Sequence, residues 1–235
     1  MKLPISDRLL ACCNFVSPGE RVADIGCDHG YLAIHLLQTG KARSVIAADI
    51  NEGPLLSAVR NAEKFGVRDR IEFHLSDGAR KIPRDFDTMV CAGMGADTIV
   101  SILEAAPWLR DPKYRLILQC QSKTPTLRRY LSETGFRIYE ESVLRDGRFL
   151  YTIMEAGWRP EYPKLTPGEW YFPPALLENP SYDVPAYYRW VLGGLELTTA
   201  HQDDPEKKLA LAELKALADD PNLSFLTKQQ EGELP

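Results

Sequence analysis

The chain has 235 residues, of which 44% are hydrophobic and 26% charged, and its net charge is −5. This length is typical of one large domain or of one domain with an appendage, and no apolar run reaches the ~18 residues that a membrane-spanning helix needs. Because the five cysteines lack Cys-x-x-Cys spacing and the first residues lack a signal-peptide core, we expect a cytoplasmic protein with reduced thiols, no zinc site and no membrane partner.

Between Arg21 and Ala156, short β-rich apolar runs alternate with runs of helical periodicity. This alternation predicts an α/β sheet with helices on both faces. The expected strands are Arg21–Ile25, Ser44–Asp49, Ile71–Leu75, Thr88–Ala92, Arg115–Gln119, Arg137–Leu144 and Phe149–Glu155. The expected helices are Ile5–Phe15, Tyr31–Gln38, Gly53–Phe65, Asp97–Ala106 and Thr126–Thr134. A hairpin turn at residues 145–148 joins the last two strands. The result is a sheet of six parallel strands and one antiparallel strand, the Rossmann-like arrangement of class I methyltransferases.

The composition changes near Trp158. Seven prolines interrupt residues 160–185, which predicts an ordered but irregular connector. Helical patterns over Tyr187–Thr199 and Pro205–Ala218, with a polar break between them, then predict an antiparallel helical hairpin. Residues 159–235 hold 7 Lys+Arg and 13 Asp+Glu, a net −6, which leaves +1 for residues 1–158. We therefore expect an α/β domain over residues 1–158, followed by the connector and an acidic coiled-coil-like hairpin over residues 159–235.

The segment Val22–Gly30 carries the strongest functional signal. An apolar strand reaches Asp24, and a turn containing Gly26 and Gly30 then leads into a helix. Such a unit brings a ligand close to bare backbone and to a helix N-terminus. A carboxylate before the turn would repel a pyrophosphate but suits a cationic, amino-bearing ligand, so the loop favours S-adenosylmethionine over a dinucleotide. We predict that Asp24, Gly26, Cys27 and Gly30 bind this cofactor; an ordinary strand-to-helix turn is the alternative.

Three later loops add candidate cofactor contacts. An acid at the end of the second strand, Asp49, can accept both hydroxyls of a ribose, although it could instead cap the following helix. Asp77-Gly78 follows the third strand and is placed for the adenine amino group; a simple Asp-Gly turn is the rival interpretation. The loop after the fourth strand lies at the expected switch point of the sheet, where ligands bind. The predicted contacts from these loops are Asp49, Ile50, Asp77, Gly78, Ala92 and Gly93.

Basic and amide side chains provide weaker signals. Arg128, Arg129, Arg145 and Arg148 are candidates for phosphate contacts, although arginines of this kind are usually only solvated. Residues 119–122 supply amide groups after the fifth strand, near the same crevice. No Gly-x-Gly-x-x-Gly is present, which disfavours a nicotinamide dehydrogenase.

With these residues, the chain resembles the bacterial tRNA (adenine-22-N1)-methyltransferase family, often called TrmK. The matching features are Ile5–Leu9, Ala23–Leu32, Asp49 with Asn51–Leu55, Asp77-Gly78, Ala92-Gly93-Met94-Gly95 and Leu116–Gln119. Their order spans residues 1–155, and the helical hairpin also fits.

The resemblance implies methyl transfer from S-adenosylmethionine to N1 of an adenosine in tRNA. That atom lies on the Watson–Crick edge, so the base must be unpaired or flipped into the site. The product base is cationic, and a carboxylate such as Asp28 would stabilise its developing charge. We therefore assign Asp28, His29 and Met94 to the substrate side, as candidate catalytic residues, and tRNA as the partner.

Two other functions stay open from the residues alone. A small-molecule methyltransferase would use the same donor site, with residues 162–185 as an apolar lid. A non-catalytic module would present the helical hairpin to a partner and bind the donor weakly or not at all.

Overall fold

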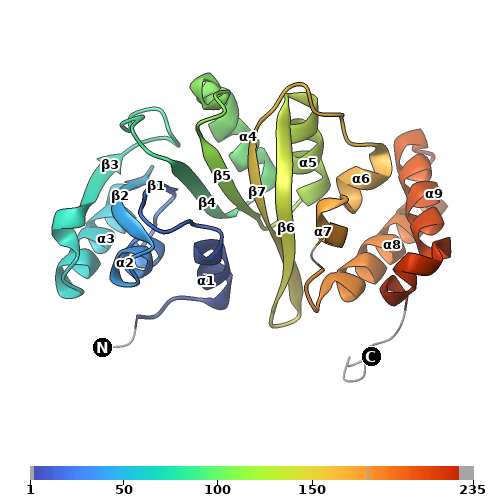
Figure 1. Ribbon diagram of the computed structural model, residues 1–235, viewed down its shortest axis with the longest axis horizontal. Helices are drawn as coiled ribbons and strands as arrows, with labels where there is room; N and C mark the ends of the chain where they lie inside the picture. Colours follow the sequence, from blue (N-terminus) through green and yellow to red (C-terminus); the bar gives the residue numbers. More distant parts are fainter. Residues whose placement is uncertain (1–2, 179, 228–235) are drawn as a thin grey trace.

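The computed structural model describes residues 3–178 and 180–227. A seven-stranded sheet forms its centre, in the order β3-β2-β1-β4-β5-β7-β6 (Figure 1). The strands are β1 (Glu20–Ile25), β2 (Ala42–Asp49), β3 (Ile71–Leu75), β4 (Thr88–Met94), β5 (Arg115–Cys120), β6 (Phe136–Asp146) and β7 (Phe149–Trp158). Strands β1 to β5 pair in parallel, and β7 is antiparallel to both β5 and β6. The predicted sheet of six co-directional strands and one antiparallel strand is confirmed.

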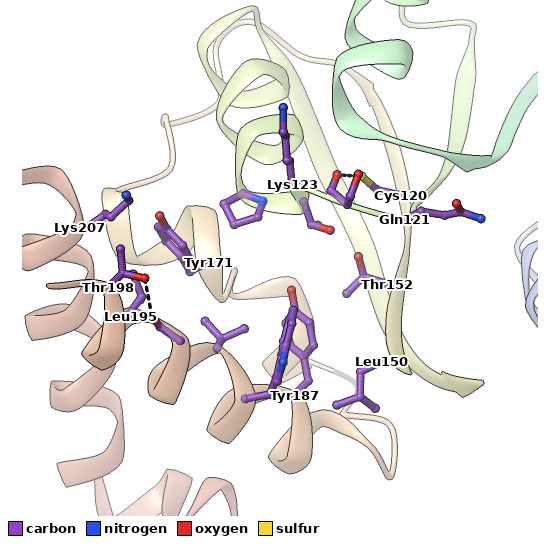
Figure 2. A pocket seen from close by; sticks show the side chains of 16 residues that line it. Cys120, Gln121, Lys123, Leu150, Thr152, Tyr171, Tyr187, Leu195, Thr198 and Lys207 are labelled. Carbon is purple, nitrogen blue, oxygen red and sulfur yellow. Dashed lines mark hydrogen bonds between the residues drawn. The ribbon is translucent and has the colours of Figure 1, made fainter. Parts of the chain in front are cut away.

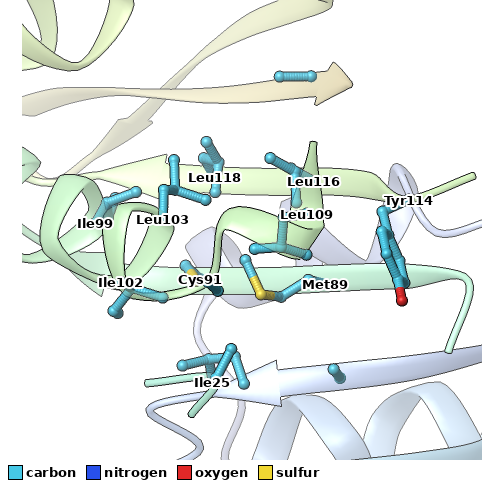
Figure 3. Packing of buried hydrophobic residues seen from close by; sticks show 14 of the residues in the cluster. Ile25, Met89, Cys91, Ile99, Ile102, Leu103, Leu109, Tyr114, Leu116 and Leu118 are labelled. Atoms are coloured by element: carbon cyan, nitrogen blue, oxygen red, sulfur yellow. The ribbon is translucent and has the colours of Figure 1, made fainter. Parts of the chain in front are cut away.

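Helices cover both faces of the sheet because successive strand residues point to opposite sides. Along β1, Ala23 packs with the cluster that holds α4 and α5, whereas Val22 packs with the cluster beneath α1, α2 and α3. Figure 3 shows the first cluster, to which Met89 and Cys91 of β4 contribute together with helix residues such as Ile102 and Leu103. The helices are α1 (Asp7–Asn14), α2 (Tyr31–Gln38), α3 (Glu52–Lys64), α4 (Ala96–Ala105) and α5 (Thr124–Glu133). All five cysteines are buried and unbridged, as expected.

The connector is more regular than its prolines suggested. It contains the short helices α6 (Pro167–Tyr171) and α7 (Ala175–Glu178). Proline is tolerated in the first turn of a helix, and Thr166 and Glu169 form a capping box in front of α6, so Pro167 begins a helix and does not break one. The predicted hairpin is present as α8 (Val184–His201) and α9 (Pro205–Asp219).

The C-terminal helices have a hydrophobic cluster of their own, which touches the sheet through Val143 of β6. The prediction that Arg128 contacts a phosphate is wrong, because its side chain is fully buried beside this cluster. Its guanidinium donates to Glu141 Oε1 at 2.6 Å, to the Tyr187 hydroxyl at 3.1 Å and to the Tyr171 carbonyl at 2.7 Å. Arg128 therefore joins α5, β6, α6 and α8 into one unit.

Within the described ranges, no helix combines the length and apolarity needed to cross a bilayer. The same residues contain no cluster of three or more His, Cys, Asp or Glu arranged to hold a metal ion.

Candidate functional site

A cavity of about 530 Å³ opens beyond the carboxyl ends of β1, β2 and β4. The strand order reverses between β1 and β4, which is the position where ligands bind in open α/β sheets. The cavity is lined by Ile25, Gly26, Asp49, Ile50, Asn51, Ser76, Asp77, Gly78, Met94, Asp97, Thr98, Ser101 and Ile102. Six of the predicted residues therefore come together here: Gly26, Asp49, Ile50, Asp77, Gly78 and Met94.

The loop after β1 needs its glycines for two separate reasons. Gly26 has φ +72°, and a Cβ built on it would lie 2.2 Å from Cε of Met94. Gly30 has φ +73° and packs against Ala58 of α3, where an added Cβ would meet the alanine Cβ at 3.0 Å. Gly26 thus keeps backbone open at the cavity, whereas Gly30 lets α2 pack against α3. Neither Gly30 nor Cys27 lines the cavity.

Asp24 lies behind the cavity and not on its surface. Its side chain is only 3% exposed, and its Oδ2 has no hydrogen-bond partner among the described residues. Burial, and secondarily the negative charge of Asp49, raises the pKa of Asp24 to about 7. An unsatisfied buried carboxyl oxygen is costly unless it meets a donor or a cation. The Asp24 carboxyl therefore keeps an unused acceptor oxygen, and its role in binding a cationic group stays a prediction.

Asp49 connects the first two loops of the sheet. Its Oδ2 accepts a hydrogen bond from the Asp28 amide at 3.1 Å, and its Oδ1 accepts from the Asn51 amide at 2.9 Å. The alternative role as helix cap is wrong, because Asn51 is the N-cap of α3. A carboxylate held by two amides at a cavity wall retains lone pairs for ribose hydroxyls.

The loop after β3 is partly structural. Asp77 is exposed and pairs with Arg80 at 3.3 Å. Gly78 has φ +57°, and a Cβ there would lie 2.9 Å from Ile102 of α4. The Ser76 hydroxyl is buried and donates to the Gly78 carbonyl at 2.8 Å. The loop therefore forms the Asp-Gly turn that was the rival interpretation. Asp77 and Gly78 nonetheless line the cavity.

The loop after β4 is tied to the loop after β5. Gly93 has φ +78°, and its amide donates to Oε1 of buried Gln119 at 2.9 Å. The Gln121 amide donates to the Met94 carbonyl at 2.8 Å. Ala92 and Gly93 do not line the cavity, but the hydrogen bonds at Gly93 and Met94 hold the backbone that carries the Met94 side chain, which lines the cavity beside Gly26.

Asp28 and His29 are exposed, and neither lines the cavity. Asp28 has φ +49°, a left-handed conformation that aspartate tolerates better than most residues. Its Oδ1 lies 3.8 Å from Nε2 of His29. Because the Asp28 amide is bonded to Asp49, the side chain is held beside the donor cavity while pointing away from the core.

Sequence reasoning missed the contribution of α4. Asp97, Thr98 and Ser101 line the cavity, together with Ile102. Polar residues at i, i+1 and i+4 on an otherwise apolar helix share a face, so the periodicity contained a signal for them. Asn51 was also missed, although it follows the predicted pair Asp49 and Ile50.

The residues around the cavity fit S-adenosylmethionine. The ligand carries an ammonium and a sulfonium, and the carboxyls of Asp24, Asp49 and Asp77 surround or back the space. The exposed side chain of Ile50 offers an apolar surface for a flat base. The volume falls within the ~300–1,000 Å³ of typical ligand pockets.

Comparisons with known proteins agree with this geometry. A family model described as a methyltransferase domain matches residues 5–154. The Bacillus subtilis tRNA (adenine(22)-N(1))-methyltransferase is 35% identical over 161 residues, which cover 67% of this chain and 68% of the relative.

Solved structures extend the likeness to almost the whole chain. A Streptococcus pneumoniae protein, a candidate tRNA (m1A22) methyltransferase in complex with S-adenosylmethionine, is 32% identical with a TM-score of 0.78. That match covers 89% of this chain and 99% of the other. M. capricolum TrmK in complex with the cofactor product S-adenosylhomocysteine is 26% identical with a TM-score of 0.75, and the match covers 92% and 98%.

Proposed function

This chain belongs to the tRNA (adenine(22)-N(1))-methyltransferase family, and we propose that it transfers a methyl group from S-adenosylmethionine to N1 of an unpaired adenosine, position 22, in tRNA. The observation that carries this proposal is the cavity at the switch point of a family-matched sheet, backed by the unpartnered carboxyl of Asp24.

Asp24 and Asp49 would hold the donor at two points. Asp24 would accept the cationic amino acid part, because its buried oxygen has no other partner. Asp49 would accept the ribose hydroxyls while its two backbone bonds keep the carboxylate in place. The other predicted contacts would shape the loops around the bound cofactor. They are Gly26, Cys27, Gly30, Ile50, Asp77, Gly78, Ala92 and Gly93. When bound, the cofactor supplies an electrophilic methyl group on a positively charged sulfur.

Adenine N1 has an available lone pair, so this chain needs no general base before attack. Its contribution is to hold the base in line with the methyl group and to exclude competing nucleophiles. As the base becomes cationic, a carboxylate close to it lowers the barrier. Asp28 is an exposed acid whose amide is bonded to Asp49 of the donor cavity, and His29 lies 3.8 Å from its carboxylate. Together with Met94 of the cavity lining, these two residues form the proposed substrate side.

We also propose that the reaction takes place in the cytoplasm, where a tRNA substrate would be met. We propose that residues 1–158 bind the donor and carry out the transfer, while residues 159–235 form an accessory lobe. Recognition of the RNA would depend on shape and phosphates more than on a base code.

The test is incubation with radiolabelled S-adenosylmethionine and unmodified bulk tRNA, followed by nucleoside mass spectrometry. We expect N1-methyladenosine with the wild type and a large loss with Asp28→Ala, while binding of S-adenosylhomocysteine by Asp28→Ala is unchanged. Asp69→Ala removes an exposed acid that does not line the cavity, and this control should behave as the wild type. Donor binding without any label in tRNA would reject the tRNA assignment, and turnover without RNA would support a small-molecule methyltransferase.

A further inference from the structure

A second cavity is lined by Gln121, the residue whose amide donates to the Met94 carbonyl. This cavity of about 240 Å³ is lined by Gln121, Arg148, Phe149, Leu150, Tyr151 and Trp190. These residues come from the β5–α5 loop, the β6–β7 hairpin and α8. The methyltransferase sheet and the helical lobe thus build this cavity together.

A larger cavity of about 390 Å³ continues from it and shares Gln121, Leu150 and Trp190. Figure 2 shows this larger space, where Thr152 and Leu150 of β7 face Tyr171 and Tyr187 of the helical lobe. Thr152 is 1% exposed, and its hydroxyl has no hydrogen-bond partner among the described residues. An unsatisfied buried hydroxyl on the wall of a cavity suits a ligand with polar edges.

Large aromatic side chains stand open beside the smaller cavity. Trp190 is 64% exposed and Phe149 is 52% exposed, although both are strongly apolar. The Trp190 ring lies 5.8 Å from the ring of Tyr187, which is itself buried and bonded to Arg128. Trp190 is therefore supported on a fixed element, and its exposure leaves it available to a partner.

Arginines alternate with these rings. The Arg148 guanidinium lies 4.9 Å from the Phe149 ring, and the Arg8 guanidinium lies 5.4 Å from the ring of Tyr151. Neither arginine forms an ion pair within residues 3–178 and 180–227. Aromatic faces interleaved with cations are typical of surfaces that bind single-stranded nucleic acid.

An acidic helical lobe is unexpected in a protein whose proposed substrate is RNA, so the charge of the cavity lining matters. The chain is acidic overall, and the whole excess of negative charge lies after residue 158. The two cavities nevertheless contain Arg148, Lys123 and Lys207 and no carboxylate. Lys123 pairs with Asp97 at 2.6 Å and Lys207 with Asp204 at 3.4 Å. Arg148 is therefore the cation of this lining that has no ion pair among the described residues, and it is the group that favours a phosphate here.

We propose that this cleft binds an unpaired nucleotide of the tRNA next to the methylated adenosine, with its base stacked on Trp190 and its phosphate on Arg148. The inference rests on the proposed function and adds a substrate contact in the helical lobe. The Gln121–Met94 bond connects the two sites directly, so a nucleotide held here keeps its neighbour near the donor cavity.

The experiment compares Trp190→Ala, Trp190→Phe and Arg148→Ala with Leu197→Ala. Leu197 lies on the same helix, is 67% exposed and lines neither cavity, so its truncation is a matched control. Each variant is assayed for affinity for unmodified tRNA without donor, for kcat/KM of methyl transfer and for binding of S-adenosylhomocysteine.

We expect Trp190→Ala to weaken tRNA affinity and kcat/KM about tenfold or more, the usual loss when a stacking aromatic is removed. Trp190→Phe should keep most of the affinity, and Arg148→Ala should reduce the salt dependence of tRNA binding by about one ion. Binding of S-adenosylhomocysteine should stay unchanged in all four. Trp190→Ala indistinguishable from Leu197→Ala in tRNA affinity would overturn the proposal. The affinity measurement needs no turnover. Failure of this proposal can therefore be distinguished from failure of the proposed function, in which the wild-type protein would not methylate tRNA.

Discussion

The Asp28 backbone amide donates a 3.1 Å hydrogen bond to Oδ2 of Asp49, and this bond joins the loop after β1 to the end of β2. This bond matters because the two residues have different proposed partners. Asp49 lines the donor cavity and is the proposed acceptor of the ribose hydroxyls, whereas Asp28 is exposed and is the proposed substrate-side acid. The Asp49 carboxylate, which would accept the ribose hydroxyls, thus also holds the backbone of Asp28 in place.

Asp49→Ala should weaken donor binding strongly. The substitution removes the acceptor of two backbone amides together with the proposed acceptor of the ribose hydroxyls. Hydrogen bonds to a charged group contribute about 1.5–3 kcal/mol each, so a loss of about 10- to 100-fold in affinity is expected. Calorimetric titration with S-adenosylhomocysteine measures it, and Asp69→Ala is the control. Unchanged affinity in Asp49→Ala would remove Asp49 from the donor site.

Donor binding should depend on pH through Asp24. Burial raises the pKa of this carboxyl to about 7, so the empty protein holds a proton there below about pH 7. The ammonium group of the ligand favours the ionised carboxylate, so binding below that pH must release the proton. Affinity for S-adenosylhomocysteine should therefore fall as the pH is lowered from about 7 to 6, by up to about tenfold. Titrations in buffers of different ionisation enthalpy detect the released proton.

The same shift affects the free energy of unfolding with a definite sign. The unfolded chain loses the Asp24 proton near the ordinary aspartate pKa of about 4, whereas the folded chain keeps it to about pH 7. The contribution of Asp24 to stability must then decrease as the pH rises between these values. Asp24→Asn should abolish both this trend and the proton release. Proton release that persists in Asp24→Asn would assign it to another group.

The fold was predictable because its signals are local and agree with one another. Ile71–Leu75 and Tyr31–Gln38 have the predicted bounds, since apolar periodicity and turn residues mark both ends. The β6–β7 hairpin exceeded its prediction at both ends, because pairing with β5 and β6 extends β7 to Trp158 and β6 continues to Asp146, inside the predicted turn. Tertiary hydrogen bonds of this kind leave little trace in the residues themselves.

The site was only partly predictable for the same reason. The glycine turn and Asp49 lie at strand ends, which pattern alone locates. Thr98 and Ser101 belong to a helix whose facing surface depends on how it packs on the sheet. Arg128 is the clearest case: its Glu141 partner lies on a different element, and no local feature predicts a buried ion pair.

Gly26→Ala should impair methyl transfer more than stability. The alanine Cβ would lie 2.2 Å from Met94 Cε, and the end of a methionine side chain can move, so Met94 should leave its place beside the cavity. Gly40→Ala is the matched control: Gly40 also has φ +72°, and a Cβ there meets nothing within 4 Å. Both variants should lose about 1–2 kcal/mol from left-handed backbone strain.

Only Gly26→Ala should then reduce kcat/KM and donor affinity. Thermal unfolding measures the shared loss, and kinetics with tRNA separates the two. Equal kinetic effects in Gly26→Ala and Gly40→Ala would mean that position 26 requires glycine because of backbone strain, and not because of the position of Met94.

Arg128→Met should destabilise the attachment of the helical lobe. The variant leaves Glu141 fully buried without its cation, and the Tyr171 carbonyl and Tyr187 hydroxyl without their donor. Breaking a buried pair from one side costs about 3–5 kcal/mol. Arg129→Met is the neighbouring control, because the exposed pairs of Arg129 with Glu133 and Glu206 should contribute less than about 1 kcal/mol.

Urea unfolding followed by fluorescence and by circular dichroism measures both variants. Binding of S-adenosylhomocysteine should survive in Arg128→Met, because the donor cavity lies on other elements. The double variant Arg128→Met with Glu141→Met should recover much of the stability, since no buried charge is then left alone. If the double variant is as unstable as Arg128→Met, the loss comes from the carbonyl and hydroxyl contacts of the guanidinium. The buried charge would then not be its cause, and Arg128 would act as a hydrogen-bonding bridge between α6 and α8.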